Sequence, residues 1–261
     1  MSDLLQENTS NLLLRALAPE AYALLQPSMQ RVELPLRFDL VLPDVATGFV
    51  YFLERGLGSL VAINSDDESV EVGHIGYEGM TGSHLLLKVE QTPNKAFMQV
   101  EGSGISVPAA VLLSMVEQVP TANDLLLRYV HCCELQLAHS ALANGRYNMH
   151  ERLARWLLMC HDRLRDDDLR LTHEFLSLML GVRRSGVTNE IHILEGVGAI
   201  RGTRGNIRIL NRQKLEEIAG GSYGIPEQEY ERYVGLPIKR FDLAKPTEVT
   251  GGGYLAMEGR S

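Results

Sequence analysis

Short alternations of hydrophobic and polar residues dominate the first part of the chain. From Val32 to Leu40, hydrophobic side chains occupy every second position, which is the period of a half-buried β-strand. Further strand candidates lie between turns rich in Gly, Asn and Asp, at residues 49–53, 58–63, 70–75, 96–100 and 105–107. Strands this closely spaced predict an antiparallel β-sandwich or β-roll, because a parallel βαβ sheet needs a long connection, usually a helix, between its strands.

Helical periodicity replaces this pattern from Pro108 onward, with breaks expected at Pro120 and at Asn144-Gly145. Residues 11–29 are also expected to be helical, with Pro19 as an interruption. Near the C-terminal end, the Gly-, Pro-, Tyr- and Glu-rich stretch from Gly220 is expected to be flexible or to lie on the surface.

The segment 121–143 has a hydrophobic stripe that allows two interpretations. A 4-3-4 spacing, typical of paired helices, joins Leu126, Val130, Cys133 and Leu137. One interpretation is a seam with a second copy of the chain, and the other is the core of a single subunit. The sequence favours neither.

A helix-turn-helix pattern occupies residues 171–195. Thr172 is a good N-cap for a first helix, and Gly181 can adopt the left-handed conformation that ends it. The second helix has one hydrophobic face, and on its other face lie short polar side chains suited to reading bases in a major groove. The residues predicted to face base edges are Arg184, Ser185, Thr188, Asn189 and His192. Taken alone, this pattern fits an ordinary amphipathic surface helix equally well.

The following segment, residues 199–210, resembles a basic β-hairpin next to the second helix. Arg183, Arg201 and Arg204 are predicted to contact DNA phosphates. Residues 181–214 contain seven basic and two acidic side chains and so carry +5, whereas the whole chain of 261 residues carries −8. The rest of the chain therefore carries −13, which is typical of a DNA-binding module attached to an acidic domain.

These features resemble the Crp/Fnr family of bacterial transcription regulators. The likeness runs from about Val32 to Ala219 and is most specific in residues 151–158, the helix-turn-helix and the hairpin, or wing. It implies an α+β fold with an N-terminal antiparallel, cyclic-nucleotide-binding-like β-roll, a long dimerisation helix and a C-terminal winged helix-turn-helix. It also implies a homodimer that binds double-stranded DNA at near-palindromic operators, with RNA polymerase as a further candidate partner.

On this basis we predict four regions. They are a sensor β-roll (1–120), a dimerisation helix and hinge (121–147), a winged helix-turn-helix domain (148–219) and a C-terminal extension (220–261). The alternative function is a ligand-binding or protein-interaction module whose helix-turn-helix no longer binds DNA.

No cofactor is predicted. Where cyclic-nucleotide-binding members of the family have Gly-Glu and Arg-Ser or Arg-Thr pairs, this chain has Gly82-Ser83-His84 and Asn94-Lys95-Ala96, so we do not expect cyclic AMP binding. The family's iron–sulfur members carry cysteines mostly near the N-terminus, but here the first cysteine is Cys132, which excludes a cluster of that type. Haem is not expected either, because His74 and His84 look like solvated loop residues. Candidate effector-binding residues, with a scaffold role as the alternative, are Glu78, Ser83, His84 and Lys95.

Other chemistries find little support in the sequence. Cys132, Cys133 and Cys160 have no zinc-site spacing and are expected to be reduced and packed, although a contact between two Cys133 residues across a dimer is conceivable. Residues 166–168 form a run of aspartates that we expect to be a solvated loop rather than a metal site. No catalytic motif is present, so an enzyme is not predicted. With neither a membrane-spanning run nor a secretory signal, the protein is expected to be cytoplasmic.

Overall fold

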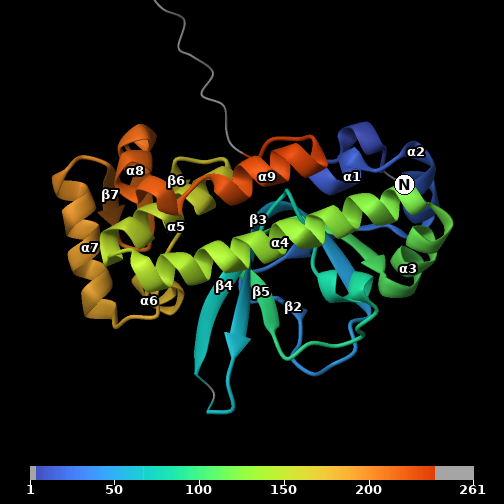
Figure 1. Ribbon diagram of the computed structural model, residues 1–261, viewed down its shortest axis with the longest axis horizontal. Coiled ribbons are helices and arrows are strands. Elements are labelled where there is room, and N and C mark those ends of the chain that lie inside the picture. The colour runs from blue at the N-terminus through green and yellow to red at the C-terminus, as the bar shows by residue number, and fades with distance from the viewer. Residues whose placement is uncertain (1–3, 67, 239–261) are drawn as a thin grey trace, which may run out of the picture.

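The computed structural model describes residues 4–66 and 68–238 and has two parts joined by a long helix (Figure 1). An N-terminal five-stranded antiparallel sheet is flanked by short helices. The elements of this part are α1 (Leu12–Ala16), α2 (Pro19–Leu25), β1 (Gln30–Leu34), β2 (Asp39–Val41), β3 (Phe49–Ile63), β4 (Ser69–Ile75), η3 (Ser83–Leu87), β5 (Lys95–Pro108) and α3 (Ala109–Gln118). The expected combination of an antiparallel N-terminal sheet, a long helix and a C-terminal helix-turn-helix is confirmed.

The sheet has the order β1-β5-β3-β4, with β2 also paired to β5. Segments predicted as separate strands merge, because β3 and β5 each continue through the glycines that were expected to be turns. Gly56 has φ +86°, and a Cβ added to Gly102 would lie only 2.0 Å from the Arg55 carbonyl oxygen. The two glycines therefore mark irregularities in a continuous strand pair, where the register shifts, and not chain reversals.

The predicted strand from Val32 to Leu40 was wrong in its middle. Arg37 has φ +66°, and its backbone N–H donates to the Met98 carbonyl oxygen at 2.8 Å. The left-handed residue breaks the strand into β1 and β2, so that both pieces pair with β5.

The long helix α4 (Pro120–Arg146) runs from α3 to the C-terminal domain (Figure 1). It begins at the break expected at Pro120 and passes through the one expected at Asn144-Gly145. Leu126 is 0% exposed and Val130 7% exposed within the single chain. These two residues of the 4-3-4 stripe are therefore core of their own subunit, while Cys133 and Leu137 are half-buried.

The C-terminal domain begins with α5 (Met149–Leu164), which carries a capping box of Asn148 and Glu151 at its start. A three-stranded sheet in the order β6-β8-β7 and three more helices complete it. These elements are β6 (Asp168–Leu169), α6 (His173–Leu180), α7 (Arg184–Gly196), β7 (Ile200–Thr203), β8 (Asn206–Ile209) and α8 (Arg212–Ala219). Leu57 of β3 belongs to the same hydrophobic cluster, so the core of this domain continues into the N-terminal sheet.

The stretch after Gly220 departs from expectation. Residues 225–234 form a further helix, α9 (Ile225–Val234), which packs along α4, and Tyr230 is only 2% exposed. Its hydroxyl donates to the Glu78 carbonyl oxygen at 2.6 Å. The expectation of a flexible or surface segment was therefore wrong as far as Ile238, because a tyrosine and apolar residues at helical spacing are buried there. Residues 239–261 lie outside the described part of the chain.

Among the described residues, no helix combines the length and hydrophobicity needed to cross a membrane.

Candidate nucleic-acid interface

Helices α6 and α7 form a helix-turn-helix whose ends are determined by local sequence. The Thr172 side chain accepts a hydrogen bond from the Phe175 backbone N–H at 3.2 Å and begins α6. Gly181, with φ +62°, ends the helix in the left-handed conformation, as the sequence predicted. Three buried side chains of α7, Val187, Ile191 and Leu194, hold it against the domain core.

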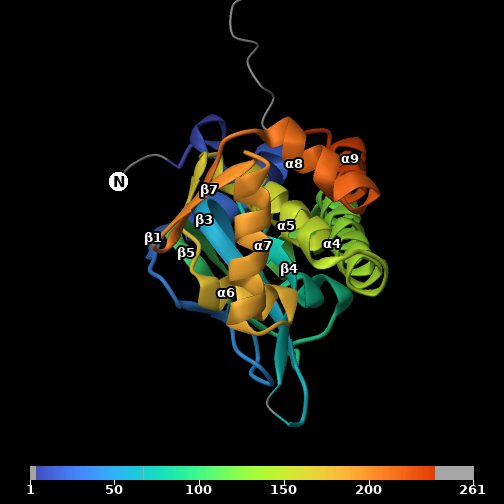
Figure 2. The same ribbon diagram turned by 90° about the vertical axis from the view of Figure 1, so that its left-hand side faces the viewer.

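The opposite face of α7 is open to solvent. Figure 2 shows this helix at the outer end of the molecule, in front of the rest of the domain. Four of the residues predicted to face bases are exposed on it, namely Arg184, Ser185, Asn189 and His192. Arg183 is the N-cap residue of α7 and is also exposed. The structure therefore gathers these side chains on one accessible surface.

Thr188 differs from the other predicted base-reading residues. Its hydroxyl lies 3.3 Å from His173 Nδ1 and 3.3 Å from the Arg184 carbonyl oxygen, and the residue is half-buried. The hydroxyl thus links the two helices of the motif.

The predicted wing is the β7–β8 hairpin, which turns at Gly205 with φ +75°. Arg201 and Arg204 are exposed on it, as phosphate contacts would require. Arg208 lies 3.7 Å from Asp168, so its charge is partly balanced on the exposed surface of the protein.

Glu195 connects α7 to the wing, a role that the sequence analysis missed. Its Oε1 accepts a hydrogen bond from the Gly202 backbone N–H at 2.7 Å, and this bond holds the pKa of the carboxyl below its usual value. Its Oε2 lies 3.1 Å from His192 Nδ1. The spacing of three residues between His192 and Glu195 on a helix was the available signal.

The candidate effector residue Glu78 is engaged inside the protein. Its Oε1 accepts from Arg163 Nε at 2.8 Å, and both side chains are almost completely buried. Arg163 belongs to α5 and Glu78 to the loop after β4. This ion pair therefore joins the N-terminal sheet domain to the C-terminal domain.

The other candidate effector residues have separate partners. His84 Nε2 lies 3.0 Å from the Thr47 hydroxyl, and Lys95 Nζ lies 2.8 Å from Asp39. Ser83 is half-buried at the start of η3. Glu78, His84 and Lys95 are thus engaged by three different neighbours.

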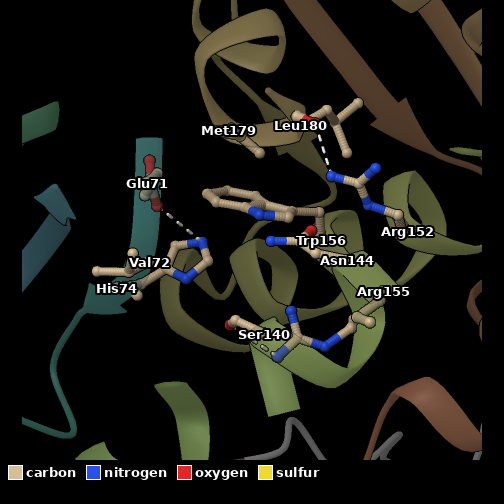
Figure 3. Close-up of a pocket in the computed structure, with 12 residues that line it drawn as sticks. Glu71, Val72, His74, Ser140, Asn144, Arg152, Arg155, Trp156, Met179 and Leu180 are labelled. Carbon is tan, nitrogen blue, oxygen red and sulfur yellow. Dashed lines mark hydrogen bonds and ion pairs between the residues drawn. The ribbon is translucent and has the colours of Figure 1, made fainter. Parts of the chain in front are cut away.

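A small cavity lies where β4, α4, α5 and α6 meet (Figure 3). Its volume is about 10 Å³, close to the least that one water molecule needs. His74 packs against Trp156 with ring centroids 3.7 Å apart and the rings tilted by 51°, and its Nε2 lies 3.5 Å from Glu71. Burial raises the pKa of Glu71 and lowers that of His74, so both neutral forms are favoured. The expectation that His74 is a solvated loop residue was therefore wrong.

A larger groove of about 900 Å³ separates the N-terminal sheet from α6. Leu36, Phe97 and Leu178 contribute apolar walls, while Arg37 and Arg183 contribute charge. The groove thus reaches from the N-terminal sheet to the N-cap residue of α7.

The cysteines are free and packed in helices, as expected. Burial raises the pKa of the Cys133 thiol to about 12 and that of Cys132 to about 11. Cys133 also packs against the core of its own subunit. A thiolate is therefore disfavoured at both positions near neutral pH.

The run of aspartates at residues 166–168 is exposed and bonded to neighbouring protein groups. Asp167 lies 2.8 Å from His161, and Asp168 accepts from Asn206 at 3.0 Å. Within the described ranges, no group of three or more His, Cys, Asp or Glu side chains has a metal-binding arrangement.

Comparison with family models decides what the C-terminal domain is. Residues 151–218 match the model of the Crp-like helix-turn-helix domain. The chain carries a Crp-like helix-turn-helix domain. The matched region begins within α5 and ends within α8, so it contains the helix-turn-helix and the wing described above.

Solved structures extend the likeness beyond this domain. FixK2 from Bradyrhizobium japonicum has a TM-score of 0.63 at 16% identity, and the match covers 74% of this chain and 98% of that chain. The c-di-GMP-responsive regulator CLP from Xanthomonas campestris has a TM-score of 0.59 at 14% identity over 74% and 99% of the two chains. A CRP/FNR-family regulator from Thermus thermophilus has a TM-score of 0.54 at 19% identity over 73% and 98%. The expected Crp/Fnr-type architecture is confirmed. No curated protein matches the chain by sequence.

Proposed function

We propose that this protein is a sequence-specific transcription regulator that binds DNA through α7 and the β7–β8 wing. The observation that carries the proposal is the single exposed surface on which the polar face of α7 adjoins an arginine-bearing hairpin, within a Crp-like domain. Recognition, and not catalysis, is then the activity of this surface. DNA as the partner also makes the cytoplasm the expected location.

The residues of this surface divide into two roles. Arg184, Ser185, Asn189 and His192 read base edges in the major groove, whereas Arg183, Arg201 and Arg204 contact phosphates. Thr188 contributes chiefly by fixing α7 against α6, since its hydroxyl is bonded within the motif.

The regulator acts as a homodimer through the outer face of α4. Because Leu126 and Val130 of the stripe are buried inside the subunit, we assign pairing to the outer face, where Leu127 is 38% and Leu142 45% exposed. Ala138 lies between them on the same exposed face, and its small side chain permits close approach of a second helix. Two recognition helices would then bind half-sites roughly 34 Å apart on a near-palindromic operator.

Residues 1–120 form the sensor region, residues 121–147 the dimerisation helix and hinge, and residues 148–219 the DNA-binding domain. A cyclic phosphate is not the signal that we expect, since Lys95 pairs with Asp39 and Glu78 with Arg163. In this proposal the signal acts through the contacts between the sensor region and α5. RNA polymerase is the further partner expected of a regulator bound beside a promoter.

The test is selection of duplexes from a random DNA pool by the purified protein at near-physiological salt, with and without cell-extract small molecules. We expect enrichment of a two-fold symmetric site. Substitution of Asn189 by Ala is expected to weaken operator binding by about 1–3 kcal/mol and to relax the preference at one base pair. Substitution of Arg204 by Ala should weaken all duplexes alike and reduce the salt dependence.

A paired substitution of Arg183 and Arg184 by Ala separates the two candidate functions. Under the proposal, DNA retention is lost. If the wild type enriches no site and the double variant retains duplex DNA as the wild type does, the chain is instead a ligand-binding or protein-interaction module.

A further inference from the structure

His192 and Glu195 form a hydrogen-bonded pair at the surface of α7. His192 Nδ1 lies 3.1 Å from Glu195 Oε2, and the side chain of His192 is 70% exposed. Within the described part of the chain, the second ring nitrogen, Nε2, has no hydrogen-bond partner. The imidazole is therefore held at one nitrogen and free at the other.

The carboxylate that holds the imidazole is itself fixed by the wing. Oε1 of Glu195 accepts from the Gly202 backbone N–H at 2.7 Å, which leaves Oε2 for His192. An ionised carboxylate can only accept hydrogen bonds, so Nδ1 must carry the proton. A neutral imidazole then has a bare Nε2, which is an acceptor.

The position of His192 on the helix gives this tautomer a consequence for DNA. At 100° per residue, His192 lies between Ser185 and Asn189 on one side and Arg184 on the other, near the centre of the exposed face. An acceptor presented to the major groove can bond only to a donor. The donors there are the amino groups of cytosine N4 and adenine N6, whereas guanine O6 and N7 and thymine O4 are acceptors.

We propose that Glu195 is a positioning residue that fixes the tautomer of His192, so that His192 selects a base with an exocyclic amino group. This inference rests on the proposed DNA-binding function. Arg201 of the wing also acts electrostatically on Glu195 and supports its ionised form. One acidic side chain thereby anchors the wing with one oxygen and sets a base preference with the other.

The decisive variant is Glu195→Gln. Gly202 N–H can still donate to the amide oxygen, and this bond directs the amide NH₂ group toward His192 Nδ1. Because NH₂ is a donor, Nδ1 must now accept, and the proton moves to Nε2. The variant should therefore keep the wing in place while it reverses the hydrogen-bonding character of the exposed nitrogen.

Two measurements at about pH 8, where an ordinary imidazole is neutral, test the inference. The first is the ¹⁵N chemical shifts of His192 in the free protein, which distinguish the tautomers without DNA. The second is selection from duplexes randomised at each operator position. The wild type should show protonated Nδ1 and a preference of about three- to tenfold for adenine or cytosine at one position per half-site. Glu195→Gln should show protonated Nε2 and a shift toward guanine or thymine there.

Two controls accompany the test. Glu217→Gln makes the same chemical change on an exposed site of α8 and should leave both readouts unchanged. His192→Phe should abolish the preference at that position while the preference set by Asn189 remains.

The inference is overturned if the wild-type ring carries its proton on Nε2, or if Glu195→Gln switches the tautomer and leaves the base preference unchanged. A wild type that enriches no operator overturns the proposed function, and with it the role of His192 in selecting a base. In that case the ¹⁵N shifts still decide whether Glu195 fixes the tautomer.

Discussion

Glu78 and Arg163 form a buried ion pair between the two domains, and Glu227 and Asp162 also attract the Arg163 guanidinium. Their side chains are 4% and 2% exposed, and Arg163 also donates to the Met159 carbonyl oxygen at 3.1 Å. Removing two charges from water is costly, so a buried pair contributes little net stability compared with apolar residues, but either charge left alone is strongly destabilising. The pair therefore fixes which groups meet at the domain boundary.

We expect Arg163→Met to lower the free energy of unfolding by about 3–5 kcal/mol, because Glu78 is then a buried charge without its partner. Urea denaturation measures the change. The double variant with Glu78→Gln and Arg163→Met should recover a large part of the loss. If the single variant loses no more free energy of unfolding than the double variant, the two charges are not coupled.

His74 is a single residue that should make the stability of the protein depend on pH. Burial and the nearby Arg163 and Arg155 lower its pKa well below 6.5, so the folded protein binds the proton less readily than the unfolded chain. As the pH falls below about 6.5, the unfolded state gains a proton that the folded state does not, and stability decreases. Between pH 7.5 and 5.5, the free energy of unfolding should therefore change less with pH in His74→Phe than in the wild type.

Glu71 is expected to change stability with pH in the direction opposite to His74. Burial raises its pKa above 4.5, so its contribution to stability is present below that pH and is lost as the pH rises through the folded-state pKa. Glu71→Gln should therefore remove a decrease in stability with rising pH. Parallel pH profiles for the wild type and both variants would contradict this account of the cavity.

At the scale of elements, α4 has two hydrophobic surfaces with different roles. Leu126 and Val130 pack inside the subunit, whereas Leu127 and Leu142 face solvent in the single chain. Substitution of Leu126 by Ala is therefore expected to lower stability by about 2–5 kcal/mol.

Leu142→Glu tests the outer surface of α4. This change introduces a charge on the face that we assign to the dimer, so it should shift the protein toward monomers in sedimentation velocity experiments and leave the folding of the subunit intact. Leu24→Glu is the matched control, because Leu24 is 41% exposed on α2, away from α4's outer face. A dimer that tolerates Leu142→Glu as well as Leu24→Glu would exclude this face as the interface.

At the scale of the whole molecule, residues 220–238 connect the C-terminal domain back to the N-terminal one (Figure 1). Arg155 of α5 donates to the Ser222 carbonyl oxygen at 3.0 Å, and Tyr223 hydrogen-bonds to Asp162 at 2.5 Å. Farther along, Tyr77 donates to the Ile238 carbonyl oxygen at 2.8 Å. This segment lies beyond the matched Crp-like domain and stabilises the placement of the two domains.

We expect Tyr230→Ala to lower the free energy of unfolding by about 3–5 kcal/mol, because a large buried aromatic side chain is lost. The cavity left by the missing ring should also expose Cys132, which lies against α9 and is 6% exposed in the wild type. Thiol reagents should therefore label Cys132 faster in this variant. Tyr230→Phe loses only the hydrogen bond to Glu78 and should cost about 0.5–1.5 kcal/mol. Equal labelling rates in the two variants would show that α9 does not cover Cys132.

The sequence by itself determined the elements whose signals are local. The caps at Thr172 and Gly181, the hydrophobic face of α7 and the arginines of the wing all follow from spacings within a few residues. For the same reason the exposed surface proposed to bind DNA was predicted almost completely, although its residue roles stay predictions. Glu195 was missed because its partner Gly202 is on another element, at a distance that sequence spacing does not reveal.

Only the tertiary structure decided features that depend on contacts between distant segments. It showed that β3 and β5 continue through their glycines, that the 4-3-4 stripe of α4 faces its own subunit, and that residues 225–234 form a packed helix. A composition rich in Gly and Pro indicates a loop only when no neighbouring surface can bury the hydrophobic residues in it. Here Tyr230 meets such a surface, formed by α4 and the loop that carries Glu78.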